Sequence, residues 1–315
     1  MTVLVTGVAG FVGSHLAEDL VRSGREVRGL DAFTDYYARS AKERNLADLR
    51  TDGSFVLVEG DLATTSLEPL LDGVEVVYHL AGQPGVRPSW GADFHRYVHH
   101  NVTATQRLLE ACRNFSLAKF VYASSSSVYG NAESYPTAET MRPQPVSPYG
   151  VTKLAGEHLC EVYRTAFGVP TVSLRLFTVY GPRQRPDMAF SRLVAAGIDG
   201  TAFELYGDGS QTRDFTYVSD VVRAMRSAST SPWCGVANVG GGSRTSMNTV
   251  IELLEELCGP IEIHRGPPAR GDVRHTAADT TVAREAFGYI PQTTLRDGLA
   301  LMVDCARRTE HERVH

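Results

Sequence analysis

The stretch that decides the fold is TVLVTGVAGFVGSHL at residues 2–16, where a β-rich run leads through a glycine-rich turn into a helical pattern. Gly7, Gly10 and Gly13 are spaced three apart in this turn. Glycines between a first strand and a first helix let backbone amides and the positive end of the helix dipole meet a pyrophosphate. Glycines also mark ordinary turns, so the spacing alone is a weak signal. The position of the run between strand and helix is what favours a dinucleotide-binding site.

An acidic residue at the end of the next β-rich run agrees with this interpretation. Asp31 closes the segment VRGLD, 18 residues after Gly13, near the distance expected for an acid that binds the adenosine ribose. An anion there would repel a 2′-phosphate, so the sequence predicts NAD rather than NADP as cofactor. Asp61, at the end of a third β-rich run, is placed to reach the adenine edge, with a helix N-cap role as the alternative.

Short β-rich runs alternate with helical segments through the first half of the chain. These runs are TVLVT, EVRGL, FVLVEG, VEVVYHL, KFVYAS and TVSLRL. The alternation predicts an α/β fold of the Rossmann type, with a doubly wound parallel sheet and helices on both faces. After about residue 178 it gives way to Gly/Pro-rich loops, with further helices expected near 187–198, 218–229, 246–257 and 294–311.

This change of pattern predicts a smaller α/β lobe beside the sheet. We expect an NAD-binding domain over residues 1–178, to which residues 215–240 return. Residues 179–214 and 241–315 are expected to form the smaller lobe, which binds the substrate.

Composition argues against several other classes of protein. The chain has a formal net charge of −5 and no concentrated basic stripe, so we expect no nucleic-acid partner. No apolar run reaches the roughly 18 residues that a membrane span needs, so we expect no membrane association. No leader pattern precedes the first β-rich run and the five cysteines are scattered, which predicts a cytoplasmic protein without a metal site. His99 and His100 are adjacent and should point apart on a helix, so we interpret them as polar surface.

A tyrosine and a lysine one helical turn apart give the strongest chemical signal. The segment SPYGVTKLAGEHL places Tyr149 and Lys153 at positions i and i+4, on one face of a helix. Ser147 is the expected N-cap and Pro148 lies in the first turn. A cation beside a phenol lowers the pKa of the phenol toward working pH, which makes a tyrosine a general base. The pair follows a glycine fingerprint and a serine-terminated strand, so it predicts catalysis rather than surface chemistry.

Together these features resemble the extended short-chain dehydrogenases/reductases, specifically the nucleotide-sugar epimerase/dehydratase branch. The resemblance covers nearly the whole chain and rests on the motifs TGVAGFVGSHL, GDL, HLAGQPGVR, SSSSVYG, YGVTK, RLFTVYGPRQRPD, YGDGSQTRDFTYV and PPARGDV. It implies bound NAD, a UDP-sugar substrate and the catalytic residues Ser125, Tyr149 and Lys153. The cofactor contacts that it implies are Gly7, Gly10, Phe11, Val12, Asp31, Asp61, Leu62, Leu80, Ala81, Tyr149 and Lys153.

The serine run limits the reaction that the resemblance implies. Relatives that eliminate water from a hexose carry Asp and Glu where this chain has Ser126 and Ser127, and UDP-glucuronate decarboxylases carry Glu at Ser127. We therefore expect chemistry at carbon 4 only. In this interpretation Ser125 supplies a catalytic hydroxyl, and Ser124 is a local capping residue.

The loop after the sixth β-rich run indicates which sugar is bound. Thr178 with the pattern PRQRPD resembles UDP-glucuronate 4-epimerases, in which the equivalents of Thr178 and Arg185 hold the sugar carboxylate. The planar fork of arginine suits a carboxylate. Galactose epimerases carry Asn in place of Thr178. The substrate contacts that the resemblance implies are Arg87, Ser126, Ser127, Thr178, Arg185, Gln211, Arg213, Arg270 and Asp272.

Three other functions stay open. Decarboxylation to a UDP-pentose is disfavoured by the missing Glu, and UDP-glucose/galactose 4-epimerisation is disfavoured by Thr178 and Arg185. A non-catalytic NAD-binding regulator is disfavoured because the catalytic residues are all present. Relatives dimerise through helices that correspond to residues 92–113 and 147–167, so the resemblance implies a homodimer with a four-helix bundle. Ala32 replaces the Asn that is usual in the family.

Overall fold

The computed structural model describes residues 1–267 and 273–314. Its largest element is a seven-stranded parallel sheet with the strand order β11-β6-β5-β4-β1-β2-β3. The strands are β1 (Thr2–Thr6), β2 (Glu26–Asp31), β3 (Phe55–Glu59), β4 (Val74–His79), β5 (Lys119–Ser125), β6 (Thr171–Leu176) and β11 (Gly235–Val239). The first strand lies inside the sheet and the chain winds outward in both directions, which confirms the predicted doubly wound Rossmann sheet.

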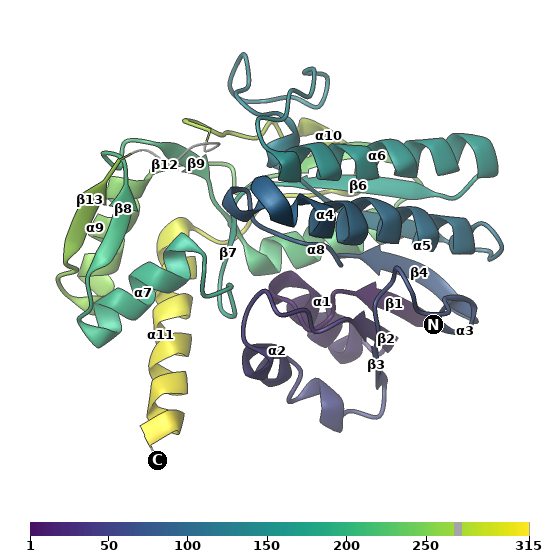
Figure 1. Cartoon of the computed structure of the whole chain (residues 1–315), viewed down its shortest axis with the longest axis horizontal. Helices are drawn as coiled ribbons and strands as arrows, with labels where there is room; N and C mark the ends of the chain where they lie inside the picture. Colours follow the sequence, from purple (N-terminus) through teal and green to yellow (C-terminus); the bar gives the residue numbers. More distant parts are fainter. Residues whose placement is uncertain (268–272, 315) are drawn as a thin grey trace.

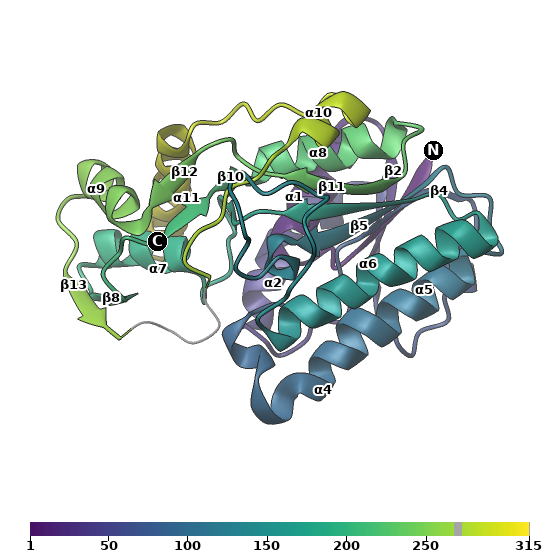
Figure 2. The same cartoon turned by 90° about the horizontal axis from the view of Figure 1, so that it is seen from above.

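Helices cover both faces of this sheet (Figures 1 and 2). One face carries α1 (Phe11–Arg22), α8 (Val218–Thr230) and α10 (Thr281–Phe287), and the other carries α3 (Glu68–Leu71), α5 (Ala104–Cys112) and α6 (Pro148–Phe167). Side chains of a strand point alternately to the two faces. Val3 and Val5 accordingly join the apolar core under α1 and α8, while Leu4 joins the core under α5 and α6.

A second lobe lies at the carboxyl ends of the strands (Figure 1). It contains β7 (Val179–Tyr180), α7 (Ala189–Asp199), β8 (Phe203–Tyr206), β9 (Thr212–Asp214), β10 (Thr216–Tyr217), β12 (Arg244–Ser246), α9 (Met247–Cys258), β13 (Ile263–Gly266) and α11 (Leu295–Val314). The strands pair as β10-β7, β12-β9 and β13-β8. Leu193 of α7, Leu254 of α9 and Leu299 of α11 share an apolar cluster that is separate from those of the main sheet.

Short helices occupy several connections. They are α2 (Arg39–Asn45), η1 (Leu49–Thr51), η2 (Arg87–Ser89), η3 (Gly91–Asp93), α4 (Phe94–Tyr97), η4 (Val98–Thr103) and η5 (Ser126–Val128). In the part of the chain that the structure describes, no helix combines the length and the apolar character needed to cross a bilayer.

A π-helical turn, η4, connects α4 to α5. It changes the directions of the adjacent side chains because a π-helix has more residues per turn than an α-helix. The ring centroids of His99 and His100 lie 4.7 Å apart. The expectation that these two rings point apart is therefore wrong.

Close backbone contacts shape the glycine-rich turn between β1 and α1. Gly7 has a φ of +69°, and a Cβ built on Gly13 would lie well within the van der Waals contact distance of the Gly7 carbonyl oxygen. Asp31 Oδ2 accepts a hydrogen bond from the Ala9 amide at 2.9 Å, and Asn45 Nδ2 donates to the Ala9 carbonyl at 3.0 Å. The turn is thus fixed from both sides, and the residue at position 13 has no space for a side chain.

We expect Gly13→Ala to lower the free energy of unfolding by about 1–3 kcal/mol, the usual cost of forcing a methyl group into a packed site. Urea unfolding followed by circular dichroism measures the change. Gly53→Ala is the matched control, because nothing lies within 4 Å of a Cβ at position 53 and its φ is not left-handed. Equal stability of the two variants would contradict this account.

Candidate active site

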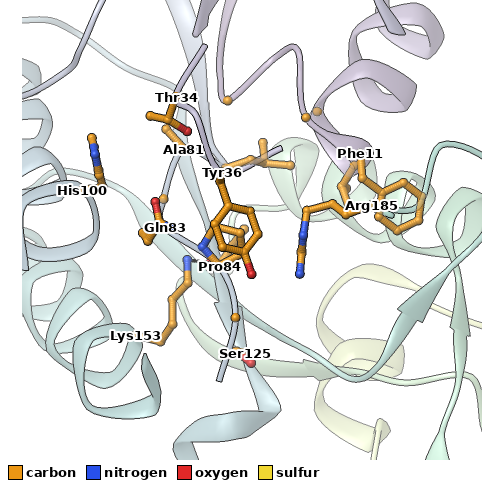
Figure 3. A pocket seen from close by; sticks show the side chains of 18 of the residues that line it. Phe11, Thr34, Tyr36, Ala81, Gln83, Pro84, His100, Ser125, Lys153 and Arg185 are labelled. Carbon is orange, nitrogen blue, oxygen red and sulfur yellow. Dashed lines mark hydrogen bonds between the residues drawn. The ribbon is translucent and has the colours of Figure 1, made fainter. Parts of the chain in front are cut away.

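A cavity of about 450 Å³ opens where the strand ends meet the second lobe (Figure 3). Its walls come from the glycine-rich turn, the segments that follow β2, β4 and β5, the start of α6 and the loop after β7. Sixteen of the predicted catalytic, cofactor-binding and substrate-binding residues line it: Gly7, Gly10, Phe11, Val12, Asp31, Asp61, Leu62, Leu80, Ala81, Ser125, Ser126, Ser127, Tyr149, Lys153, Thr178 and Arg185. The structure therefore brings together the candidate catalytic, cofactor and carboxylate residues.

Two candidate substrate residues lie outside this cavity, around Tyr206 of the second lobe. The Arg87 guanidinium lies 4.2 Å from the ring centroid of Tyr206. Gln211 Nε2 donates to the Tyr206 carbonyl oxygen at 3.1 Å. Arg87 and Gln211 thus form a neighbouring cluster that joins the segment after β4 to the second lobe.

The remaining candidate substrate residues are in or near the segment that precedes α10. Arg213 does not line the cavity, and its Nη1 donates to the Arg274 carbonyl at 3.2 Å. Arg270 and Asp272 lie outside the described residues.

The end of β5 and the start of α6 hold the central hydroxyl groups. Ser125 Oγ accepts a hydrogen bond from the Ser127 amide at 3.1 Å and so caps the short helix η5. Ser147 Oγ accepts from the Gly150 amide at 3.1 Å, which confirms the predicted N-cap of α6. Tyr149 lies in the first turn of α6 and lines the cavity together with Ser125.

The electrostatics of Tyr149 differ from the expectation. Burial is the largest influence and raises the pKa of Tyr149, whereas the Ser125 hydroxyl and the charge of Arg185 lower this pKa. Lys153 Nζ donates to the Ala123 carbonyl oxygen at 2.9 Å, and burial lowers the pKa of Lys153 to about 8. The expectation that the pKa of Tyr149 is lowered is therefore wrong for this arrangement, and the cation that acts against burial is Arg185.

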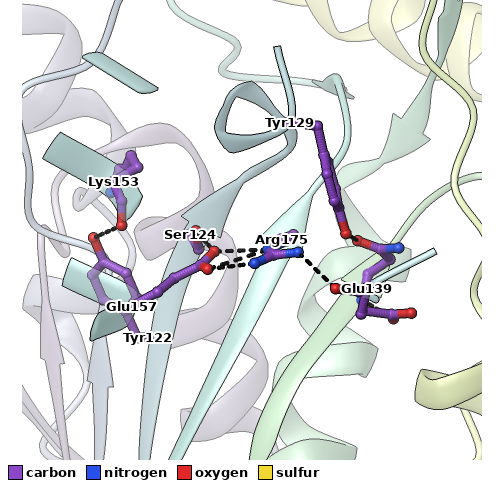
Figure 4. Close-up of polar contacts among 8 residues, drawn as sticks. Tyr122, Ser124, Tyr129, Glu139, Lys153, Glu157 and Arg175 are labelled. Carbon is purple, nitrogen blue, oxygen red and sulfur yellow. Dashed lines mark hydrogen bonds and ion pairs between the residues drawn. The ribbon is translucent and has the colours of Figure 1, made fainter. Parts of the chain in front are cut away.

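A buried polar network supports the end of β5 (Figure 4). Ser124 and Arg175 are partners across β5 and β6, and both bind Glu157 of α6. Ser124 Oγ donates to Glu157 Oε1 at 2.5 Å, and Arg175 Nη2 donates to Glu157 Oε2 at 2.7 Å. The Arg175 and Glu157 side chains are only 5% and 4% exposed. Ser124 therefore has a structural role, although it acts through Glu157 and not as the local cap expected.

The charge of Glu157 also acts on the candidate catalytic lysine. Glu157 follows Lys153 by one helical turn, and its charge raises the pKa of Lys153 against the stronger effect of burial. The network thus fixes the strand that carries Ser125 and favours the charged form of Lys153.

Asn101 is a positioning residue that the sequence analysis missed. Asn101 Oδ1 accepts from the Gln83 amide at 2.6 Å, while its Nδ2 donates to the Gln83 carbonyl at 3.1 Å and to Thr152 Oγ1 at 3.0 Å. A Cβ on Gly82 would lie 2.9 Å from Asn101 Oδ1. Asn101 therefore ties the loop after β4 to α6. The one signal for Asn101 in the sequence was an amide side chain within a helical pattern.

The segment after β2 contributes further lining residues that the sequence analysis missed. Thr34, Tyr36, Tyr37 and Lys42 all border the cavity. Lys42 Nζ donates to the Thr34 carbonyl at 2.7 Å. No hydrophobic period marks this segment, so nothing in the sequence pattern indicated its position.

Asp61 meets two histidines at the edge of the cavity. Asp61 Oδ1 accepts from the Ala63 amide at 2.8 Å, and Oδ2 lies 2.9 Å from His99 Nε2. With His100, these side chains bring three atoms of the metal-ligating type within 4.8 Å of one another. Asp61 thus caps a turn, not a helix as considered from the sequence, and it lines the cavity. Its contact with the adenine edge stays a prediction.

Comparisons with known proteins agree with this geometry. Residues 3–240 match the model of the NAD dependent epimerase/dehydratase family. The uncharacterized UDP-glucose epimerase YtcB of Bacillus subtilis is 46% identical over 95% of this chain and 96% of its own length. UDP-glucuronate 4-epimerase 2 of Arabidopsis thaliana is 39% identical over 96% of this chain and 75% of its own.

A solved structure is also closely similar to this chain. The crystal structure of UDP-glucuronic acid 4-epimerase from Bacillus cereus, in complex with UDP-glucuronic acid and NAD, has a TM-score of 0.95 to this chain. The two proteins are 43% identical, and the match covers 98% of this chain and 100% of the other. A family model, relatives that match 95% and 96% of this chain, and a solved structure thus lead to one conclusion: the chain belongs to the NAD dependent epimerase/dehydratase family.

Proposed function

We propose that this chain is an NAD-dependent UDP-glucuronate 4-epimerase, which interconverts UDP-glucuronate and UDP-galacturonate. The observation that carries the proposal is that Thr178 and Arg185 line the same cavity as Ser125 and Tyr149. A guanidinium at this position suits a sugar carboxylate. The relatives named for this activity support the same conclusion.

The residues at the glycine-rich end of the cavity fit NAD. Gly7 and Gly13 have no space for side chains against the neighbouring backbone, which lets a pyrophosphate approach the start of α1. Asp31 lies at the end of β2 in the cavity wall, where a carboxylate disfavours a 2′-phosphate. We propose that these residues, together with Asp61, hold the adenosine half of the cofactor.

The proposed mechanism acts at carbon 4 of the sugar. When bound, NAD accepts a hydride from carbon 4 and later returns it to the opposite face of the sugar. Ser125 and Tyr149 hold the carbon 4 hydroxyl, and Tyr149 takes its proton as general base. The positive charge of Arg185 favours the phenolate of Tyr149. Lys153, fixed by the Ala123 carbonyl, positions the base and the cofactor ribose.

The carboxylate needs restraint during this reaction. The 4-keto intermediate is a β-keto acid, which loses carbon dioxide when the breaking bond overlaps the carbonyl. We propose that Thr178 and Arg185 hold the carboxylate out of that alignment.

Replacement of Arg185 tests the carboxylate site. We expect Arg185→Ala to weaken binding of UDP-glucuronate about ten- to a hundredfold, because a charge-assisted hydrogen bond contributes about 1.5–3 kcal/mol. Binding of UDP, which has no sugar carboxylate, should change little. Isothermal titration with both ligands measures the difference. Equal losses for UDP and UDP-glucuronate would contradict the proposed contact.

Proton NMR of the purified enzyme with UDP-glucuronate and no added cofactor tests the reaction itself. Appearance of UDP-galacturonate would support the proposal and would show that NAD is retained during purification. A UDP-pentose product would identify a decarboxylase instead. An unchanged spectrum with both UDP-glucuronate and UDP-glucose would favour the non-catalytic regulator.

UDP-glucose 4-epimerisation is the second candidate function. The name of the B. subtilis relative, a UDP-glucose epimerase, favours it. The same NMR experiment with UDP-glucose separates the two, because only the glucuronate reaction depends on a contact with a carboxylate.

We further propose that the UDP part of the substrate binds the second lobe, formed by residues 179–214 and 241–315, while residues 1–178 and 215–240 form the cofactor domain. The cluster of Arg87 and Gln211 around Tyr206 places basic and polar groups beside the cavity. These groups suit a diphosphate and a nucleoside.

We also propose that the enzyme is a cytoplasmic homodimer. Phe94, Val98, Val151 and Val162 are between 38% and 54% exposed on the run from α4 to η4 and on α6. These helical segments run side by side on one face of the molecule (Figures 1 and 2). Two such pairs would bury these side chains in a four-helix bundle. Analytical ultracentrifugation tests the stoichiometry.

A further inference from the structure

The Arg185 guanidinium is held by two residues that the sequence did not single out. Arg185 Nε donates to Asp187 Oδ1 at 2.9 Å, and Nη2 donates to Asp187 Oδ2 at 3.1 Å. The guanidinium carbon lies 5.6 Å from the ring centroid of Tyr36. The Tyr36 hydroxyl in turn donates to Asp187 Oδ2 at 3.1 Å. Figure 3 shows the Arg185 side chain beside the Tyr36 ring.

Three loops from different parts of the chain meet at Tyr36. Tyr36 belongs to the segment after β2, which begins just beyond Asp31, and Asp187 belongs to the loop after β7. The third loop follows β4: a Cβ on Gly85 would lie 2.5 Å from the Tyr36 hydroxyl, and Gly85 has a φ of +100°. The absence of a side chain at Gly85 thus lets the Tyr36 hydroxyl reach Asp187.

The paired contact determines which edge of Arg185 is available. A carboxylate that takes both Nε and Nη2 fixes the plane of the guanidinium, because the two hydrogen bonds are parallel. Asp187 therefore occupies one edge of the fork, and the Nη1 side is the one left to meet a ligand in the cavity. The Arg185 side chain is 19% exposed, so the surrounding protein limits its other orientations.

The Tyr36 hydroxyl keeps its proton in this setting. Burial is the largest influence and, together with the charge of Asp187, raises the pKa of Tyr36 to about 12. The hydroxyl is thus a hydrogen-bond donor throughout the physiological pH range, and its partner Asp187 stays fixed.

We propose that Tyr36 and Asp187 are positioning residues that set the direction of the Arg185 guanidinium, and so decide whether the 4-keto intermediate epimerises or loses carbon dioxide. This inference rests on the proposed function. Loss of carbon dioxide breaks the bond between carbons 5 and 6. The electron pair passes into an enolate of the 4-keto group, and water then protonates carbon 5. A guanidinium that is free to turn would let the carboxylate reach the alignment in which this bond overlaps the carbonyl.

Product partition in Asp187→Asn is the main test. Asparagine keeps the size of the side chain but loses the charge and one of the two strong acceptors. We expect the decarboxylated fraction of the products, measured by proton NMR, to rise by about tenfold. The dissociation constant for UDP-glucuronate should stay within about threefold, because the charge of Arg185 remains. Tyr36→Phe, which removes only the hydroxyl, should also raise the decarboxylated fraction, but by less than Asp187→Asn.

Asp199→Asn is the matched control, since Asp199 is an exposed acid at the end of α7. An unchanged product partition in both Asp187→Asn and Tyr36→Phe would overturn the inference. So would equal weakening of UDP and UDP-glucuronate binding, because that pattern indicates general damage to the site.

A second measurement separates failure of this inference from failure of the proposed function. The NMR signal of the Arg185 Nε–H group, assigned with Arg185→Lys, should be sharp in the wild-type protein and lost or broadened in Asp187→Asn. If the signal behaves in this way but the wild type does not convert UDP-glucuronate, the positioning contact stands and the proposed reaction fails. If the signal is unaffected by Asp187→Asn, the positioning role itself is wrong.

Discussion

Tyr149→Phe is expected to lower kcat for UDP-glucuronate by about 10²–10⁴-fold, the usual contribution of a general base. Phenylalanine keeps the ring, which packs edge-on against Tyr97 at a centroid distance of 6.3 Å. It removes the hydroxyl whose pKa the Ser125 hydroxyl lowers. The substrate should therefore bind almost normally while the carbon 4 proton has no acceptor. NMR rates and titration calorimetry measure the two effects separately.

Tyr163→Phe is the matched control for this variant. Tyr163 lies on the same helix, α6, and its hydroxyl donates to Glu110 Oε2 at 2.6 Å. It does not line the cavity. If Tyr149→Phe kept more than about a tenth of the wild-type kcat, the assignment of Tyr149 as the base would be wrong, since a base contributes at least about 10²-fold.

Glu157→Gln is expected to lower the free energy of unfolding by about 3–5 kcal/mol, because it leaves the buried Arg175 guanidinium without its anion. The pair is almost fully shielded from solvent, so water does not replace the lost partner. Ser124 also loses a charged acceptor. Urea unfolding at neutral pH measures the change.

Glu161→Gln provides a control on the same helix. Glu161 pairs with Arg164 through an exposed contact, and the two side chains are 50% and 37% exposed. Its removal should cost about 0–1 kcal/mol, as is usual for surface pairs. If the two variants lost similar amounts of unfolding free energy, burial would not be what makes the Glu157–Arg175 pair important for stability. The double variant Glu157→Leu, Arg175→Met should recover much of the loss, since a buried ion pair contributes little compared with apolar residues of similar volume.

The sheet and most helices could be predicted from sequence because their signals are local. Side chains of a buried strand are almost continuously apolar, so each of the six β-rich runs could be recognised from its own sequence. The glycine-rich turn was recognisable because positions 7 and 13 have no space for a Cβ, and glycine is the residue without one. The start of α6 was equally clear, since the Ser147 cap depends on only a few neighbouring residues.

The parts that the sequence did not reveal depend on side-chain direction. The π-turn η4 leaves a nearly helical hydrophobic pattern, so the approach of His99 to His100 had no local signal. Lys153 stands one helical turn from Tyr149, but helical spacing does not determine that its Nζ binds the end of β5. The contact of Tyr36 with Asp187 joins residues 151 positions apart in the chain. Such contacts follow only from the completed fold.

The chain enters the second lobe twice, and this has a consequence for protein engineering. Between the two visits it returns to the main sheet, where it forms α8 and β11. Leu193 of the shared apolar cluster comes from the first visit, whereas Leu254 and Leu299 come from the second. A chimera made with one crossover would combine halves of two different cores. Recombination between relatives with different sugar preferences should therefore exchange both stretches together.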